Sequence, residues 1–177
     1  MSVTVEAEAF PLARVFTISR GSRTEARVLT VTIDRDGFRG RGECVPYPRY
    51  GETVEGVAET IRAVPADVTR ARLQDLLPAG AARNALDCAL WDWEAKRAGR
   101  PVWALAGLPP PGPEVTAYTL SLDTPEAMRA QAAENAARPL LKVKLGGEGD
   151  MARLEAVRAG APRARIVVDA NEGWTAE

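Results

Sequence analysis

The chain has 177 residues, of which 46% are hydrophobic and 27% are charged, and its formal net charge is −1. This composition is typical of a globular protein, while the short apolar runs and the dispersed arginines argue against a membrane or nucleic-acid partner. Residues 1–10 lack the basic start and apolar stretch of an export signal, so we expect a cytoplasmic protein.

The first elements predicted along the chain are short strands. Strand-like runs occur at residues 3–9, 15–19 and 26–34, and the third run alternates apolar and polar residues with the period of a half-buried strand. The Asp-Gly pair at residues 36–37 then turns the chain into a fourth run at residues 40–45. The pattern predicts a β-meander.

Helices are predicted next. Apolar residues recur at helical spacing over residues 52–64, and Thr69 is a candidate cap for a short helix that ends at Pro78. Residues 81–98 predict a longer helix, which the glycine and proline that follow bring to an end. The wide apolar face of this helix consists of Ala85, Leu86, Ala89, Leu90 and Trp93.

The run PPPGP at residues 109–113 is the best candidate for a linker, because these residues cannot continue a helix or occupy a central strand. We therefore expect an α+β domain over residues 1–110 and a second domain over residues 113–177.

In the second domain, predicted strands and helices alternate with short connections. This alternation is typical of a parallel sheet, either an open doubly wound one or the opening of a (β/α) barrel. Three strands do not close a barrel, so we expect an incomplete barrel that ends at residue 177, where a further helix should begin. The predicted elements are strands at residues 115–122, 140–145 and 165–169 and helices at residues 124–138 and 150–159.

The residue types present limit the chemistry. The sequence contains no histidine, which excludes Ser-His-Asp and Cys-His catalysis and histidine-bound zinc. Its two cysteines, Cys44 and Cys88, lie far apart without a metal-type spacing and are predicted to be buried thiols. Carboxylates, tyrosine, lysine, cysteine and cofactors remain as chemical agents.

Lys142 and Lys144 form the first candidate site. In a strand they point to the same face, and they are two of only three lysines in a chain with 20 arginines. A neighbouring like charge and partial burial disfavour the protonated amine, which is how a lysine becomes a general base, whereas a guanidinium effectively cannot lose its proton. The alternative is an edge strand protected from aggregation by two solvated lysines.

Asp169 and Asn171 form the second candidate site, at the end of the last predicted strand. Parallel α/β enzymes build their active sites at this end of the sheet, and the two side chains would offer hard oxygen ligands suited to Mg²⁺. The alternative is a helix N-cap without chemical function. The Lys-x-Lys pair at the end of the preceding strand favours the chemical interpretation.

Residues 19–24 and 46–53 are polar, glycine-containing loops with arginine and tyrosine residues. Such segments can fold over a site and hold an anionic substrate, although a solvated loop is the alternative explanation.

Three segments together resemble a known family. They are ALDCALWD at residues 85–92, KVK at residues 142–144 and VDANEGW at residues 168–174. In this order and spacing they resemble the muconate-lactonising subgroup of the enolase superfamily, and within it the dipeptide epimerases that act on L-Ala-D/L-Glu. Residues 20–27 and 42–53 also look like the capping-domain loops of that family.

The resemblance implies a fold and a reaction. It implies an α+β capping domain followed by a (β/α)₇β barrel, here truncated to its first β/α units. Mg²⁺ held by three strand-end carboxylates would bind the carboxylate of a small dipeptide substrate. A base would remove the α-proton and an acid would return one on the opposite face, while the metal stabilises the enediolate. Recycling of cell-wall peptides is the implied role.

Carried over by position, the resemblance also implies the site residues. Lys144 would be the acid/base on one face, Lys142 its charged neighbour, and Asp169 the first metal ligand. Residues implied for substrate binding are Arg23, with Arg20 as the second choice, Thr119, and Tyr50 in the loop at residues 47–53 that closes over the substrate.

One departure from the family affects the prediction. The remaining metal carboxylates and the lysine of the opposite face come from later strands, so the chain as given is expected to be catalytically incomplete unless a separate chain completes it. The enzymatic alternatives are o-succinylbenzoate synthesis and cycloisomerisation. The non-catalytic alternative is a truncated protein that binds a partner, or a further copy of itself, through an exposed barrel edge.

Overall fold

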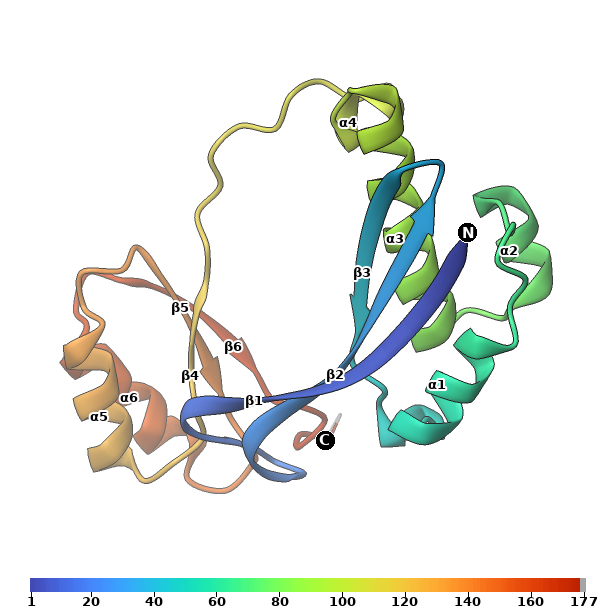
Figure 1. The fold of residues 1–177 in the computed structure, drawn as a ribbon. Helices are drawn as coiled ribbons and strands as arrows, with labels where there is room; N and C mark the ends of the chain where they lie inside the picture. The colour runs from blue at the N-terminus through green and yellow to red at the C-terminus, as the bar shows by residue number, and fades with distance from the viewer. Residues whose placement is uncertain (176–177) are drawn as a thin grey trace. The chain divides into compact units, whose positions relative to one another are not determined.

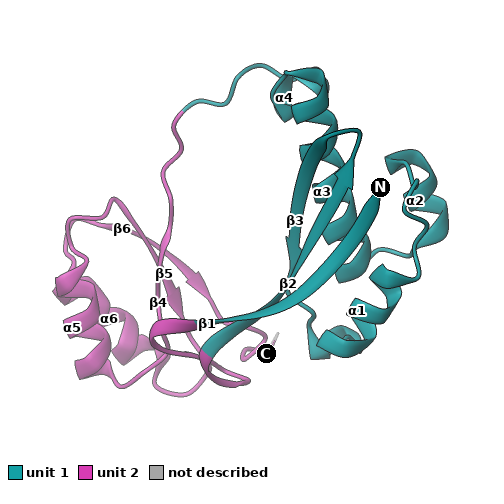
Figure 2. Cartoon of the chain, in the orientation of Figure 1, with its two compact units in different colours: residues 1–10, 25–112 teal, residues 11–24, 113–177 magenta. Residues whose placement is uncertain are grey.

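The computed structural model describes residues 1–175, and the expected start of a further helix at the chain's end lies outside them. The chain forms two compact units (Figure 2). Unit 1 comprises residues 1–10 and 25–112, and unit 2 comprises residues 11–24 and the chain from residue 113 onward. The boundary between residues 112 and 113 falls within the proline-rich run. Residues 11–24 belong to the second unit, although they lie within the range expected for the first domain.

The first sheet has the strand order β1-β2-β3 (Figure 1), with strands at Ser2–Ile18, Gly21–Arg35 and Phe38–Cys44. β2 and β3 are antiparallel, and the pair Arg35 and Phe38 closes their register. The turn between them has φ of 54° at Asp36 and 79° at Gly37, the left-handed conformation that a two-residue hairpin requires. The expected meander and its Asp-Gly turn are therefore present.

The two runs expected at residues 3–9 and 15–19 form one continuous strand, β1, instead of two. Pro11 lies within it and does not interrupt it. β1 is an edge strand of the sheet, where a residue without an N–H group can face away from the neighbouring strand at no cost to the ladder.

Helices α1 (Val54–Arg62), α2 (Arg70–Leu76) and α3 (Ala81–Ala98) accompany this sheet in unit 1, together with the short α4 (Val102–Leu105) and the 3-10 turn η1 (Pro48–Tyr50). Thr53 and Thr69 cap α1 and α2 by accepting hydrogen bonds from Gly56 N and Arg72 N. The N-terminus of α3 has no cap of its own and instead donates from Ala81 N to the Glu52 carboxylate at 2.7 Å.

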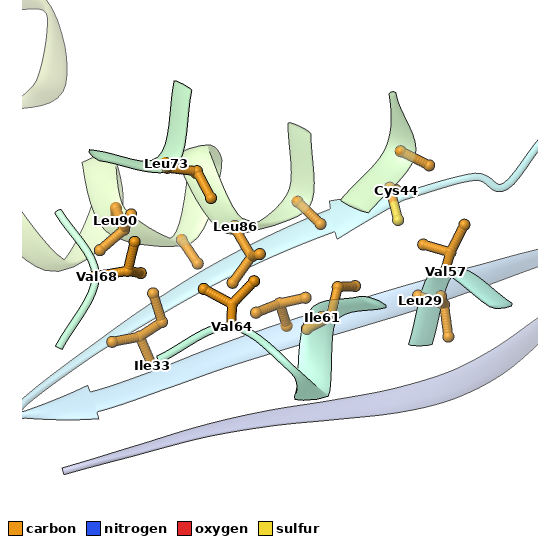
Figure 3. Packing of buried hydrophobic residues seen from close by; sticks show 14 of the residues in the cluster. Leu29, Ile33, Cys44, Val57, Ile61, Val64, Val68, Leu73, Leu86 and Leu90 are labelled. Carbon is orange, nitrogen blue, oxygen red and sulfur yellow. The ribbon is translucent and has the colours of Figure 1, made fainter. Parts of the chain in front are cut away.

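The core of unit 1 lies between the sheet and these helices (Figure 3). The expected apolar face of α3 is buried throughout. The backbone of β3 packs directly against the backbone of α3 at Gly40 and Gly42. A Cβ atom at Gly40 or Gly42 would stand only 2.1 Å from the carbonyl oxygen of Ala89 or Ala85, so only glycine fits at either position. Core residues contributed by β2, α1, α2 and α3 include Leu29, Ile33, Val57, Ile61, Leu73, Leu86 and Leu90.

The two cysteines differ. Cys44 is buried as predicted, and burial raises the pKa of its thiol to about 11. The prediction for Cys88 is wrong, because this residue is exposed on α3. It directly precedes the buried Ala89 and lies one helical position outside the apolar face.

Unit 2 contains the parallel sheet β4-β5-β6, with strands at Tyr118–Leu120, Leu140–Lys144 and Arg165–Asp169, and the helices α5 (Pro125–Glu134) and α6 (Asp150–Gly160). The expected strand–helix alternation is present, although β4 is shorter than residues 115–122. None of the helices within residues 1–175 has both the length and the apolar character to cross a membrane.

Candidate active site at the ends of the parallel strands

The two faces of the parallel sheet have opposite character. Leu141 and Val143 of β5 are fully buried in the core that the sheet shares with residues of α5 and α6, such as Met128 and Val157. The residues that alternate with them, Lys142 and Lys144, lie on the other face. The lysine pair is therefore displayed on the face of the sheet that these helices do not cover.

Both lysines bind one carboxylate. In the register of the sheet, Lys144 is paired with Asp169 of β6. The Nζ atoms of Lys144 and Lys142 lie 2.7 and 2.8 Å from Asp169 Oδ2, and the backbone N–H of Asn171 donates to Oδ1 at 2.9 Å. The Lys144 side chain is 10% exposed, whereas those of Lys142 and Asp169 are 38% and 28% exposed.

This arrangement fixes the charge of the carboxylate. Hydrogen bonds from Lys142 and Lys144, and then from the backbone N–H of Asn171, hold the pKa of the Asp169 carboxyl well below its usual range. Asp169 is therefore an anion at neutral pH. It lies at the carboxyl end of a parallel strand and pairs with both lysine ammonium groups through one oxygen. An anionic oxygen ligand and a fixed amine are the elements of metal-assisted proton transfer.

The turn that follows β6 has an unusual backbone. Asn171 and Glu172 adopt φ of 48° and 63°, a left-handed conformation that costs roughly 1–3 kcal/mol for a non-glycine residue and persists only where surrounding contacts hold it. The side-chain oxygen Oδ1 of Asn171 is buried and has no hydrogen-bond partner among the described residues. A buried polar atom of this kind normally meets a donor or a cation.

These oxygens fit the donor set of a hard cation such as Mg²⁺, which prefers carboxylate and carbonyl oxygens. Within residues 1–175, however, no three Cys, Asp or Glu side chains come together as a metal cluster. The fit therefore extends to one carboxylate, Asp169, with the neighbouring Asn171 amide oxygen as a further candidate.

The tip of the β1–β2 hairpin lies across the ends of the parallel strands, within unit 2. Beyond β4, Leu122 N donates to the carbonyl of Thr17 at 3.1 Å, and Thr17 N donates to Ser121 Oγ at 2.7 Å. Beyond β5, a Cβ atom at Gly146 would approach the Ser19 side chain to 3.6 Å. Beyond β6, Ser19 Oγ donates to the carbonyl of Asn171 at 2.7 Å. Local sequence carries no signal for these contacts.

The predicted substrate-binding residues are placed as follows. Thr119 pairs with Lys142 in the register of β4 and β5, so it lies beside the lysine pair. Arg20 contacts the turn after β6, whereas Arg23 is exposed on β2 close to the hairpin tip. Tyr50 belongs to unit 1, where it is exposed and borders a hollow of about 320 Å³ near the starts of α1 and α3. Its role at the lysine pair stays a prediction.

Asp150, at the start of α6, is a positioning residue that the sequence did not reveal. Its buried carboxylate accepts hydrogen bonds from Gly147 N at 2.7 Å and from the indole of Trp174 at 2.8 Å, so it joins the loop after β5 to the segment after β6. Burial alone would raise the pKa of Asp150, but these hydrogen bonds, led by that from Trp174, outweigh burial and leave the pKa below its usual value. The loop after β5 and the segment after β6 are also closely packed, because a Cβ atom at Gly173 would stand 3.0 Å from Gly146.

The chain combines an α+β unit with β/α units that carry amines and a carboxylate at the strand ends, and comparison with known proteins assigns it to a family. Residues 1–107 match the model of the N-terminal domain of mandelate racemase / muconate lactonizing enzymes, and the chain belongs to this family. The expected fold class, an enolase-type capping domain followed by β/α units of a parallel sheet, is confirmed.

Comparison with individual relatives narrows the similarity to dipeptide epimerases. The chain is 47% identical to the L-Ala-D/L-Glu epimerase of Escherichia coli K12, over 99% of this chain and 57% of that protein. It is 55% identical, with a TM-score of 0.94, to a crystal structure of an enolase family member from Agrobacterium tumefaciens with homology to dipeptide epimerases and bound L-Ala-L-Glu, over 98% of this chain and 55% of that one. A dipeptide epimerase from Cytophaga hutchinsonii complexed with Mg and D-Ala-L-Val is 28% identical, with a TM-score of 0.87, over 98% and 52% of the two chains.

The chain therefore spans about half the length of the relatives that it matches. The expected resemblance to dipeptide epimerases is confirmed over that half.

Proposed function

We propose that these residues form the capping domain and first β/α units of a magnesium-dependent dipeptide epimerase that acts on Ala-Glu dipeptides. The observation that carries the proposal is the convergence of Lys144 and Lys142 on Asp169 at the strand ends. The similarity of the chain to dipeptide epimerases, among them an L-Ala-D/L-Glu epimerase, supports the proposal independently.

Lys144 is proposed to move the proton on one face of the substrate. It is the more buried of the two lysines, and its Nζ is fixed by Asp169 on one side and lies 6.0 Å from the centroid of the Phe16 ring. In its neutral form this amine accepts the α-proton from the substrate carbon, and the resulting ammonium is stabilised by the Asp169 carboxylate. Lys142, on the same oxygen but more exposed, supplies the second positive charge near the reacting carboxylate.

Asp169 is proposed as one magnesium ligand, with Asn171 Oδ1 as a further candidate. When bound, magnesium supplies an electrophile that stabilises the negative charge developing on the substrate carboxylate. A proton donor on the opposite face is also needed for epimerisation, and we propose that it lies outside the residues described here.

Substrate recognition is proposed to come from the predicted set. Arg23 would pair with a substrate carboxylate, Thr119 would line the pocket beside Lys142, and Tyr50 would belong to a loop that closes over the dipeptide. An Ala-Glu substrate supports a role in recycling cell-wall peptides in the cytoplasm, which we include in the proposal.

The test is exchange of the substrate α-proton. The protein expressed from its complete coding sequence, with Mg²⁺ in D₂O, is expected to replace the α-proton of the glutamyl residue in L-Ala-L-Glu and L-Ala-D-Glu, as followed by proton NMR. Chelation of the metal should stop exchange.

Lys144→Ala should stop interconversion of the two epimers, and it should stop exchange from the epimer whose α-proton faces Lys144. Lys96→Ala is the matched control, because Lys96 is the third lysine of the chain and pairs with Asp92 on the exposed surface of α3. Continued interconversion of the epimers in Lys144→Ala, or exchange from both of them at the wild-type rate, would remove Lys144 from its assigned role. Turnover of o-succinylbenzoate precursors or muconates without dipeptide exchange would replace the proposed reaction with one of its alternatives.

A further inference from the structure

Arg20 forms its contacts with the protein itself, at the turn after β6. Its Nη1 atom donates to the carbonyl of Asn171 at 3.0 Å and lies 3.4 Å from Glu172 Oε2. Ser19 Oγ donates to the same carbonyl at 2.7 Å. The guanidinium is thus directed at the turn that follows β6.

That turn is the part of the site that needs external support. Asn171 and Glu172 are consecutive residues in the left-handed conformation, and neither is glycine. The N–H of Asn171 donates to Asp169 Oδ1, while its carbonyl is held by Ser19 and Arg20. Both peptide groups that flank the Asn171 Cα are therefore fixed, one by the catalytic carboxylate and the other by the hairpin tip.

The hairpin tip is itself firmly attached within unit 2. Thr17 forms hydrogen bonds through its N–H and its carbonyl to Ser121 and Leu122, and its hydroxyl lies 2.9 Å from that of Ser22. Arg20 therefore extends from an anchored base, which is the requirement for a side chain that positions something else.

From these contacts we propose that Arg20 is a positioning residue. It holds the Asn171–Glu172 turn, and through the Asn171 N–H it keeps Asp169 oriented toward Lys142 and Lys144. It does not bind the substrate carboxylate, a task left to Arg23. The proposal rests on the proposed function for its kinetic consequences, whereas its structural consequence holds for any reaction at this site.

The first measurement is independent of activity. Hydrogen–deuterium exchange of peptides covering residues 166–175 is compared in the wild-type protein and in Arg20→Gln. Loss of a hydrogen bond from a charged donor should speed exchange of these amides about tenfold or more. Arg14→Gln is the matched control, since Arg14 lies in the same hairpin and pairs with Glu134 on the surface. Equal exchange in Arg20→Gln and in the wild type would overturn the proposal.

Kinetics then separate positioning from substrate binding. Arg20→Gln should lower kcat about tenfold to a hundredfold while KM changes little, and it should do so equally for L-Ala-L-Glu and for a dipeptide without a side-chain carboxylate. Arg23→Gln should instead raise KM for L-Ala-L-Glu alone. A rise in KM confined to acidic dipeptides in Arg20→Gln would show that Arg20 binds substrate and would overturn the proposal.

Glu172 provides the internal check. If Arg20 acts in part through Glu172, Glu172→Gln should have little further effect when it is added to Arg20→Gln, and Arg20→Lys should restore part of kcat. If the losses of kcat from Arg20→Gln and Glu172→Gln add in the double variant, Arg20 does not act through Glu172. If the wild-type protein epimerises no dipeptide, the proposed function fails, and the exchange measurement on residues 166–175 alone decides the positioning role.

Discussion

Arg35 in unit 1 and Lys144 in unit 2 are both buried cations, with whole-residue exposures of 7% and 8%, yet their surroundings differ. The Arg35 guanidinium donates to the backbone carbonyls of Ala66 and Val68 and lies over the Trp93 ring at 4.9 Å. Lys144 donates to a carboxylate at the end of a parallel strand, beside a second lysine. Arg35 ties a loop to a sheet, whereas Lys144 is paired with a carboxylate that is itself ionisable.

The comparison shows that burial of a charge does not by itself indicate chemistry. A cation bound to backbone carbonyls has partners that cannot change their charge state, so its role is to complete hydrogen bonds in the core. A cation bound to a carboxylate at a strand end, on the face that α5 and α6 leave uncovered, retains access to a second partner. Variants at the two positions should therefore fail in different ways.

The largest effect is expected for Lys144→Arg. Arginine keeps the positive charge and the pairing with Asp169, but it cannot lose a proton at neutral pH, so proton transfer should fall by about 10²–10⁴-fold. The folded protein should retain a thermal midpoint close to that of the wild type. Epimerisation near the wild-type rate would show that Lys144 acts only through its positive charge and does not transfer the proton.

The next effect is expected for Arg35→Met, which removes the donor from two carbonyls in the core. The free energy of unfolding should fall by about 2–4 kcal/mol, as measured by urea denaturation at pH 7. Exchange activity per folded molecule should be unchanged. A variant as stable as the wild type would mean that water replaces the guanidinium and that this buried cation contributes little.

The Asp169 carboxylate adds a pH dependence that Arg35 lacks. The pKa of Asp169 is lowered in the folded protein, so its contribution to stability is present above its unfolded pKa of about 4 and is lost as the pH falls toward the folded value. The wild type should exceed Asp169→Asn by about 1–2 kcal/mol at pH 7, and the gap should close below pH 4. Urea midpoints at several pH values measure the gap, and a gap that stays constant would contradict the assignment.

The smallest effect is expected for an exposed cation. Arg39 pairs with Asp34 at 2.7 Å, but the side chains are 66% and 43% exposed. Arg39→Ala should change the free energy of unfolding by no more than about 0.5 kcal/mol, because solvent screens such pairs. A larger loss, measured by the same denaturation, would show that burial does not explain why Arg35 contributes more to stability than Arg39.

Local sequence predicted the elements of this site but not their connections. The spacing of Lys142 and Lys144 places them on one face because strand side chains alternate, and the position of Asp169 at a strand end follows from the same pattern. The bond from Trp174 to Asp150 and the docking of Ser19 on Asn171 join residues 24 and 152 positions apart. No local period encodes such contacts.

Two local signals also misled. Pro11 is normally taken as the end of a strand, but the edge position of β1 removes the need for its N–H. Cys88 lies within an apolar run of α3, but the helix buries Ala85 and Ala89 on the face next to it and leaves the thiol exposed. In both cases the position of the element in the fold decided the outcome.

The membership of the hairpin tip in unit 2 has a consequence for synthesis of the chain. Arg20 leaves the ribosome 151 residues before its partner Asn171. At ordinary elongation rates this interval is on the order of ten seconds, far longer than a hairpin needs to form. The tip of β1 and β2 therefore lacks its partners beyond β6 until the end of that strand emerges. Translation as far as the end of β6 therefore sets the earliest time at which Arg20 can support the turn at Asn171.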